Sequence, residues 1–274
     1  MLIQLDDLAL WVEQRGNGPP LLLLHGFTGS AAAWGEQLAT LAQLRHVVAP
    51  NLIGHGQSSA PADPSRYTME RCVADLLSIL NQLEVRQFDL LGYSMGGRVA
   101  MHLALTAPQR VRSLILESTA PGIADPAERA ARVASDNLLA TQIEIQGLSW
   151  FSSYWAGLAL FASQRSLPPQ VLAAQRERRL SQRPEGLANS LRGMGAGRQA
   201  SLWGRLGELS MPTLLIAGAL DPKYVAISQA MAAQITQAQL GIVQDAGHTV
   251  HLEQPTAFAE LVVGFLASGE IDQH

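Results

Sequence analysis

The sequence predicts an α/β protein with a mostly parallel, doubly wound sheet that is interrupted by a helical insertion. Two observations carry this prediction. Short apolar segments alternate with segments in which apolar residues recur at helical spacing, the order expected when helices cover both faces of a parallel sheet. This alternation stops near residue 118 and resumes near residue 211, and the stretch between them shows only helical patterns.

The first part of the chain supplies most of the predicted strands. Residues 2–11 alternate loosely before the turn formers of residues 16–20, which indicates an edge strand or a hairpin. The buried strands predicted after it are 21–24, 46–49, 88–91 and 111–116, and the helices are 34–44, 69–83 and 97–107. In the second helix, apolar residues three and four positions apart predict one buried face.

The second part of the chain contains the insertion and the end of the sheet. Helical patterns cover residues 127–142, 145–161 and 169–180 and a shorter stretch at 187–191. A strand at 211–218, a helix at 225–236, a strand at 239–243 and a helix at 256–266 complete the alternation. We therefore expect one continuous domain, with a core of residues 1–118 and 204–274. Residues 119–203 would form a helical lid over the carboxyl edge of the sheet, where ligands of such sheets bind.

The strand at 88–91 ends in Gly92-Tyr93-Ser94-Met95-Gly96, directly before a helical pattern. A Gly-x-Ser-x-Gly between a strand and a helix predicts a sharp turn that exposes the central hydroxyl at the edge of the sheet. Glycine on either side removes the Cβ atoms that would clash in such a turn. Ser94 is therefore the candidate nucleophile or base.

A serine hydroxyl is activated by a histidine, whose orientation an acid fixes. Asp221 comes three residues after the strand that ends at Gly218, and His248 follows the next strand. Asp245 is a rival acid, disfavoured because it lies only three residues before His248 on the same loop. The remaining candidate histidines are interpreted as loop-fixing, packing or surface residues: His25, His102 and His251.

Backbone N–H groups at this edge can stabilise a developing oxyanion. Phe27, in the glycine-rich loop after the strand at 21–24, and Met95, directly after Ser94, are the two candidate donors. No histidine pair or cluster of acids has metal-ligand spacing, so we expect neither metal nor cofactor. Cys72, the single cysteine, falls in a helical segment and is interpreted as a small buried hydrophobe.

Charge is divided unevenly along the chain, although the net charge of −4 gives no reason to expect nucleic acid. Residues 119–205 carry ten arginines against six acids, whereas the remainder carries nine basic and seventeen acidic residues. A basic insertion over an acidic body favours a small anionic substrate. A general preference for arginine, with 18 arginines and one lysine in the chain, would give the same excess.

No stretch reaches the roughly 18 apolar residues of a membrane span. The beginning of the chain lacks the basic flank and apolar run of a secretory signal, so the expected location is cytoplasmic. The pattern leaves a monomer and a weak dimer both open.

With Ser94, Asp221, His248 and the Phe27 loop in order, the chain resembles the α/β-hydrolase superfamily over nearly its whole length. A narrower resemblance rests on four segments: residues 93–98, 131–136, 154–163, and 191–197 with 201–203. These look like the MenH family, the 2-succinyl-6-hydroxy-2,4-cyclohexadiene-1-carboxylate (SHCHC) synthases of menaquinone and phylloquinone biosynthesis.

The resemblance implies a carbon–oxygen lyase in which the serine acts as a base. Such an enzyme eliminates pyruvate from 2-succinyl-5-enolpyruvyl-6-hydroxy-3-cyclohexene-1-carboxylate to give SHCHC. The substrate has three carboxylates, and the positions that match the family's pocket are Tyr93, Arg98, Arg132 and Trp155. A third insertion arginine is expected among 176, 178 and 179, with Arg179 preferred.

Several alternatives stay open beside this hypothesis. A serine esterase or carbon–carbon bond hydrolase would share every motif of the core. Arg98 could be a surface helix residue paired with an acid, Arg132 an exposed charge of the insertion, and Trp155 part of its apolar core.

Overall fold

A single twisted sheet of eight strands forms the centre of the molecule in the computed structural model, which describes residues 1–271, with side chains up to residue 268. The strands lie in the order β1-β2-β4-β3-β5-β6-β7-β8. The two antiparallel pairs, β1 with β2 and β2 with β4, lie at one end, and all other neighbours are parallel. The α/β class and the mostly parallel sheet are confirmed.

The strands are β1 (Leu2–Gln4), β2 (Ala9–Arg15), β3 (Pro20–Leu24), β4 (His46–Pro50), β5 (Phe88–Tyr93), β6 (Val111–Glu117), β7 (Thr213–Gly218) and β8 (Ala238–Val243). The α-helices are α1 (Glu36–Leu41), α2 (Met69–Gln82), α3 (Met95–Thr106), α4 (Pro126–Ala156), α5 (Pro169–Leu180), α6 (Pro184–Met194), α7 (Pro222–Ala232), α8 (Val250–Glu253) and α9 (Pro255–Ile271). Short 3-10 helices cover Ala31–Trp34, Pro64–Tyr67, Pro108–Arg110, Ala159–Ser166 and Trp203–Glu208.

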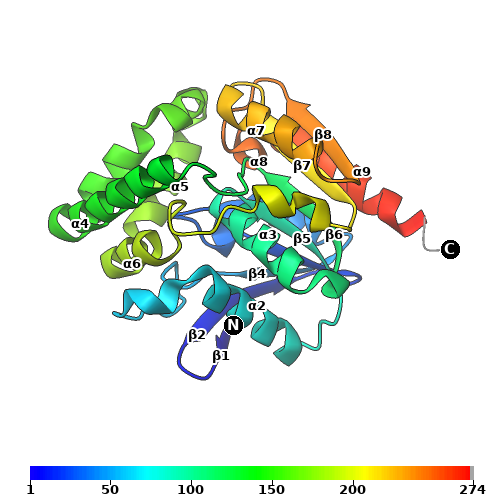
Figure 1. Ribbon diagram of the computed structural model, residues 1–274, viewed down its shortest axis with the longest axis horizontal. Helices are drawn as coiled ribbons and strands as arrows, with labels where there is room; N and C mark the ends of the chain where they lie inside the picture. The colour runs from blue at the N-terminus through cyan, green and yellow to red at the C-terminus, as the bar shows by residue number, and fades with distance from the viewer. Residues whose placement is uncertain (272–274) are drawn as a thin grey trace.

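Helices cover both faces of the sheet because the central strands are apolar on both (Figure 1). In β3, Leu22 and Leu24 join the cluster of apolar residues that α2, α3 and α7 cover. Leu21 and Leu23 join the opposite cluster, which α1 and α9 cover. Successive side chains of a strand point to opposite faces, so an all-leucine strand contributes to two cores at once.

Most predicted elements are present, and the differences have local causes. The strand or hairpin expected at 2–11 is the hairpin β1–β2. The helix expected at 34–44 is wrong in extent: Gly35, with φ +52°, separates the 3-10 helix Ala31–Trp34 from α1. The helix expected from residue 225 begins at Pro222, because the Asp221 side chain accepts a hydrogen bond from the Tyr224 amide and caps it.

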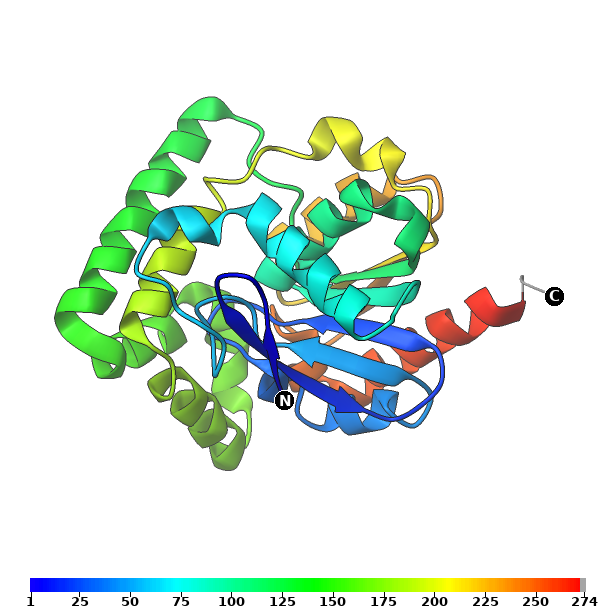
Figure 2. The same cartoon turned by 90° about the horizontal axis from the view of Figure 1, so that it is seen from below.

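Residues 119–203 contain no strand and pack beside the carboxyl edge of the sheet (Figures 1 and 2). The two helices expected at 127–142 and 145–161 are present within α4 and meet at Gly147, where φ is +77° and ψ is 176°; the second ends at Ala156. Phe151 and Ile143 of α4 pack against Leu187 and Leu191 of α6 in a separate apolar cluster. This cluster gives the segment its own small core; its assignment as a lid remains a prediction.

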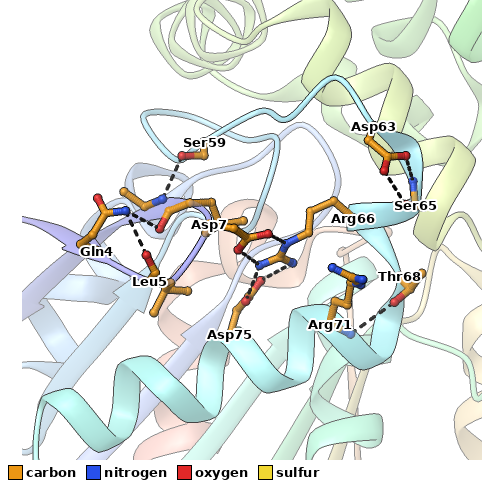
Figure 3. A network of polar contacts seen from close by, with 12 residues as sticks. Gln4, Leu5, Asp7, Ser59, Asp63, Ser65, Arg66, Thr68, Arg71 and Asp75 are labelled. Carbon is orange, nitrogen blue, oxygen red and sulfur yellow. Dashed lines mark hydrogen bonds and ion pairs between the residues drawn. The ribbon is translucent and has the colours of Figure 1, made fainter.

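A polar network joins the hairpin β1–β2 to the helix α2 (Figure 3). The Arg66 guanidinium donates two hydrogen bonds to Asp7, at 2.6 and 2.9 Å, and two to Asp75, at 3.0 and 2.7 Å. Burial raises the pKa of Asp75, whereas the hydrogen bond from Arg66 lowers the pKa of Asp7. One arginine thus ties the turn between β1 and β2 to α2.

Within the described residues, no helix combines the length and apolarity needed to cross a membrane.

Candidate active site

Ser94 lies in the sharp turn between β5 and α3, with φ +50° and ψ −108°. The end of β6 holds its backbone on both sides: the Ser94 amide donates to the Glu117 carbonyl (2.9 Å), and the Thr119 hydroxyl donates to the Ser94 carbonyl (2.8 Å). A Cβ on Gly96 would lie 2.0 Å from the Leu24 carbonyl oxygen. The strained turn therefore requires glycine beside the serine, as the motif predicts.

A chain of two hydrogen bonds leads from Ser94 to a buried acid. His248 Nε2 lies 3.1 Å from Ser94 Oγ, and His248 Nδ1 lies 2.8 Å from Asp221 Oδ2. In a neutral ring that donates from Nδ1 to Asp221, Nε2 is the acceptor for the serine hydroxyl. Asp245, the rival acid, is exposed, whereas Asp221 is buried beside the imidazole. The arrangement is suited to take a proton from Ser94.

Phe27 and Met95 both lie beside the serine. A Cβ on Gly26 would lie 3.6 Å from the Ser94 Cβ, which places the Phe27 loop against the turn. Within residues 1–271, no acceptor is present for the amide N–H of either Phe27 or Met95. Two free amide donors next to a nucleophile are the components of an oxyanion hole.

His25 fixes the Phe27 loop by hydrogen bonding, as expected. The Leu52 amide donates to His25 Nε2 (3.0 Å), so the proton of the ring is on Nδ1, which donates to the Gly26 carbonyl (2.8 Å). Burial lowers the pKa of His25 to about 3. The neutral ring therefore connects two loops at the carboxyl edge of the sheet by hydrogen bonds.

Sequence reasoning missed a second buried acid, whose partner is His251, one of the histidines interpreted as packing or surface residues. Glu117, fully buried at the end of β6, accepts from the backbone and ring N–H of His251 at 3.0 and 2.8 Å. The His251 ring lies 4.9 Å from the Tyr93 ring, edge to face. The Tyr93 hydroxyl is hydrogen-bonded to Thr249 (2.7 Å), which also accepts from Gln164 of the insertion (2.8 Å).

A small cavity of about 70 Å³ lies between the insertion and the carboxyl edge of the sheet. Three residues expected to bind substrate line it, namely Tyr93, Trp155 and Arg179. Arg178, one of the alternatives to Arg179, lines it too. Trp155 also packs 5.2 Å from the Phe27 ring, so it is both cavity wall and part of the insertion's apolar contacts.

Four residues expected at the site do not line this cavity, namely Ser94, His248, Arg98 and Arg132. Arg98 and Arg132 lie near Tyr224, whose ring is 4.6 Å from the His248 ring. Burial and the charge of Arg132 lower the pKa of Arg98 to about 10. Arg98 donates to the neutral oxygens of Met194 and Gln199, both at 2.8 Å. Arg98 is thus a desolvated cation and not a surface residue paired with an acid.

Arg132 has a different environment. Its side chain is 44% exposed and forms an ion pair of 2.8 Å with the buried Asp136 one helical turn along. Part of its charge is therefore already compensated, which weakens its candidacy for a substrate carboxylate.

Comparison with known proteins agrees with this geometry. A family model described as the alpha/beta hydrolase fold matches residues 19–255. The chain belongs to the α/β-hydrolase family. A Bacillus subtilis protein, named provisionally as an SHCHC synthase, is 43% identical over 248 residues, which cover 90% of each chain. The resemblance of this α/β-hydrolase to the SHCHC synthases is confirmed.

Two further matches compare the chain with a synthase and with a hydrolase. The solved structure of MenH from S. aureus has a TM-score of 0.91 at 33% identity, covering 95% of this chain and 98% of that one. A 2-hydroxymuconate semialdehyde hydrolase from Pseudomonas is 34% identical over 271 residues, 94% of this chain and 90% of that one. The α/β-hydrolase fold is therefore shared with a hydrolase as well as with the synthases.

Proposed function

We propose that the chain is an SHCHC synthase, a carbon–oxygen lyase of menaquinone or phylloquinone biosynthesis. Its resemblance to proteins named as such over 90% of the chain supports this proposal. The substrate class is a small molecule with several carboxylates. Pyruvate is eliminated from 2-succinyl-5-enolpyruvyl-6-hydroxy-3-cyclohexene-1-carboxylate, and SHCHC remains.

The observation that carries the proposal is a set of buried or half-buried arginines that form no ion pair with an acid among the described residues. Arg98 donates only to neutral oxygens, Arg178 to the Ala32 carbonyl and Arg179 to Gln175. Burial lowers the pKa of all three guanidinium groups. A desolvated cation without a counter-charge is unfavourable, so an arriving carboxylate would be bound strongly. A neutral ester as substrate would not explain buried arginines without a counter-charge.

In the mechanism we propose, Ser94 is the base. Its Oγ takes a ring proton of the substrate while His248 Nε2, at 3.1 Å, takes the hydroxyl proton, and Asp221 stabilises the imidazolium that forms. The electron pair of the broken C–H bond enters the conjugated diene, and the C–O bond to the enolpyruvyl group breaks. The leaving group departs as the enolate of pyruvate, which gains a proton at its methylene carbon to become pyruvate. The imidazolium of His248 gives up its proton, so the net proton balance is zero.

The amides of Phe27 and Met95 would stabilise the negative charge that develops on the succinyl carbonyl oxygen. Both are free to donate within the described residues. The helical insertion would act as the lid, with Trp155, Arg178 and Arg179 closing the cavity over the substrate. Water excluded by such a lid strengthens each of these charge interactions.

A carbon–carbon bond hydrolase or esterase is the alternative function. The relative named as 2-hydroxymuconate semialdehyde hydrolase favours it, since it is 34% identical over nearly the same length. In that reaction Ser94 would attack the substrate carbonyl and form an acyl enzyme.

A coupled assay separates the two functions. The unstable enolpyruvyl compound is generated in situ by the enzyme of the preceding step, and pyruvate and the diene are followed with and without this protein. A panel of p-nitrophenyl esters is hydrolysed in parallel, with mass spectrometry of Ser94. Fast pyruvate release with slow ester turnover supports the lyase; acyl enzyme and fast ester turnover without accelerated pyruvate release contradict it.

A further inference from the structure

Glu253 contacts the backbone on both sides of His248. It is the last residue of α8 and is 9% exposed. One carboxylate oxygen accepts from the Gly247 amide at 2.7 Å, and the other accepts from the Thr249 amide at 3.0 Å. Hydrogen bonds to a charged acceptor are about twice as strong as neutral ones. The carboxylate therefore fixes the backbone amides of Gly247 and Thr249, the residues on either side of His248.

The Glu253 carboxylate and the His248 loop lie in a closely packed region between the insertion and β7. A Cβ on Gly247 would lie 3.0 Å from the Glu253 carboxylate and 2.1 Å from the Ser163 hydroxyl of the insertion. A Cβ on Gly218, at the end of β7, would lie 2.2 Å from the Gly247 carbonyl oxygen. Glycine at both positions lets the His248 loop sit against β7 while the carboxylate reaches it.

We propose that Glu253 is a positioning residue for His248 in the elimination, an inference that rests on the proposed function. The imidazole must hold Ser94 Oγ at 3.1 Å and Asp221 at 2.8 Å at the same time. A small rotation of the backbone at residue 248 would break one of these contacts. Misplacement of a reacting group by about 1 Å costs about a hundredfold in rate.

A simpler role has to be separated from this one. The bond from the Thr249 amide to Glu253 closes the first turn of α8, as side chains near helix starts commonly do. A helix cap alone predicts lower stability with unchanged kinetics. The bond from Gly247, three residues before the helix begins, is not needed for capping.

The test is Glu253→Gln, which keeps the side-chain volume but turns an amide NH₂ toward one of the two backbone donors. Glu260→Gln, an exposed change on α9, is the matched control. We measure pyruvate release and hydrogen exchange at the amides of Gly247 and Thr249. For Glu253→Gln we expect kcat to fall by about tenfold to a hundredfold with KM within about twofold, and exchange protection to be lost. Glu260→Gln should match the wild type.

Unchanged kcat despite lost protection, or unchanged protection, overturns the proposal. Where Glu253→Gln does not fold, Glu253→Asp is measured instead, since its shorter side chain cannot span both amides. A wild-type chain that releases no pyruvate contradicts the proposed function only. The positioning role is then decided by the rate at which a fluorophosphonate labels Ser94: slower labelling in the Glu253 variant supports it, and equal labelling overturns it.

Discussion

Ser94 illustrates how much a short motif can predict at the scale of a residue. Glycine on both sides, a strand before and a helix after predict the strained turn that the structure contains at φ +50°. The order of Asp221 and His248 along the chain predicts the two hydrogen bonds that link them to the serine. These residues are predictable because each follows directly from the end of a strand, whose position the apolar pattern gives.

The residues that sequence reasoning missed share a different property. Glu117 and Glu253 are buried carboxylates whose partners are a ring and backbone amides elsewhere in the fold. Nothing in local periodicity predicts which buried acid will find such a partner. Tyr224 was equally unpredictable, because its contact with the His248 ring depends on how α7 packs against the His248 loop.

Arg98 provides the test of carboxylate binding. Removing the guanidinium with Arg98→Ala should raise KM and lower kcat/KM. The fall in kcat/KM should correspond to a loss of about 2 to 5 kcal/mol of transition-state stabilisation, because a buried charge pair with the substrate is lost. Steady-state kinetics on the enolpyruvyl substrate measure this. Arg198→Ala, an exposed change of the same kind, serves as control and should have no effect. An unchanged KM in Arg98→Ala would remove Arg98 from the binding site.

Helices and strands were predictable in kind but less so in extent. Apolar runs predicted the parallel strands because both faces of the sheet are buried. In the insertion, the two helices expected at 127–142 and 145–161 are present within α4, but the break between them lies at Gly147 and the second helix ends at Ala156. The break falls at Gly147 because glycine adopts the local φ of +77° at no steric cost.

A prediction at this scale concerns the packing of α3 on β3. Gly96→Ala places a methyl group 2.0 Å from the Leu24 carbonyl and should lower the free energy of unfolding by about 3 kcal/mol or more. Urea unfolding measures it. Gly264→Ala, on the helix α9 with no atom near its Cβ position, should raise stability by about 0.5 to 1 kcal/mol. Equal stability of the Gly96 variant and the wild type would refute the close approach.

Charge separation is the feature of the whole molecule that sequence and structure connect. The insertion holds nine of the chain's 18 arginines, and two of them, Arg178 and Arg179, line the cavity. The remainder of the chain is acidic. A cationic wall inside an anionic body concentrates small anions at the cavity and repels them elsewhere.

Stability of the whole fold should fall in mild acid because of two buried histidines beneath the Phe27 loop. Both titrate near 6.5 when unfolded, but burial lowers the pKa of His25 to about 3 and that of His55 to about 4. Between these values the unfolded chain binds more protons, so stability is complete above pH 6.5 and is lost as the pH falls. By pH 5 each contributes a loss of about 2 kcal/mol.

Urea unfolding at pH 7 and pH 5 measures this loss. His55→Asn should reduce the pH dependence by about one proton, since one titrating ring is removed. His46→Asn, on the half-exposed start of β4, is the control. The same pH dependence in His55→Asn and wild type would show that His55 is not a source of the acid sensitivity.

The central claim is that Ser94 performs the elimination of pyruvate, and the most direct test compares wild type and Ser94→Ala in the coupled assay. The account predicts fast release of pyruvate with formation of the diene by the wild type. In Ser94→Ala, kcat should fall by about 10³ to 10⁶-fold at unchanged stability, as when other serine sites of this kind lose a member. A loss of less than about tenfold would contradict the claim, because the base would then lie elsewhere.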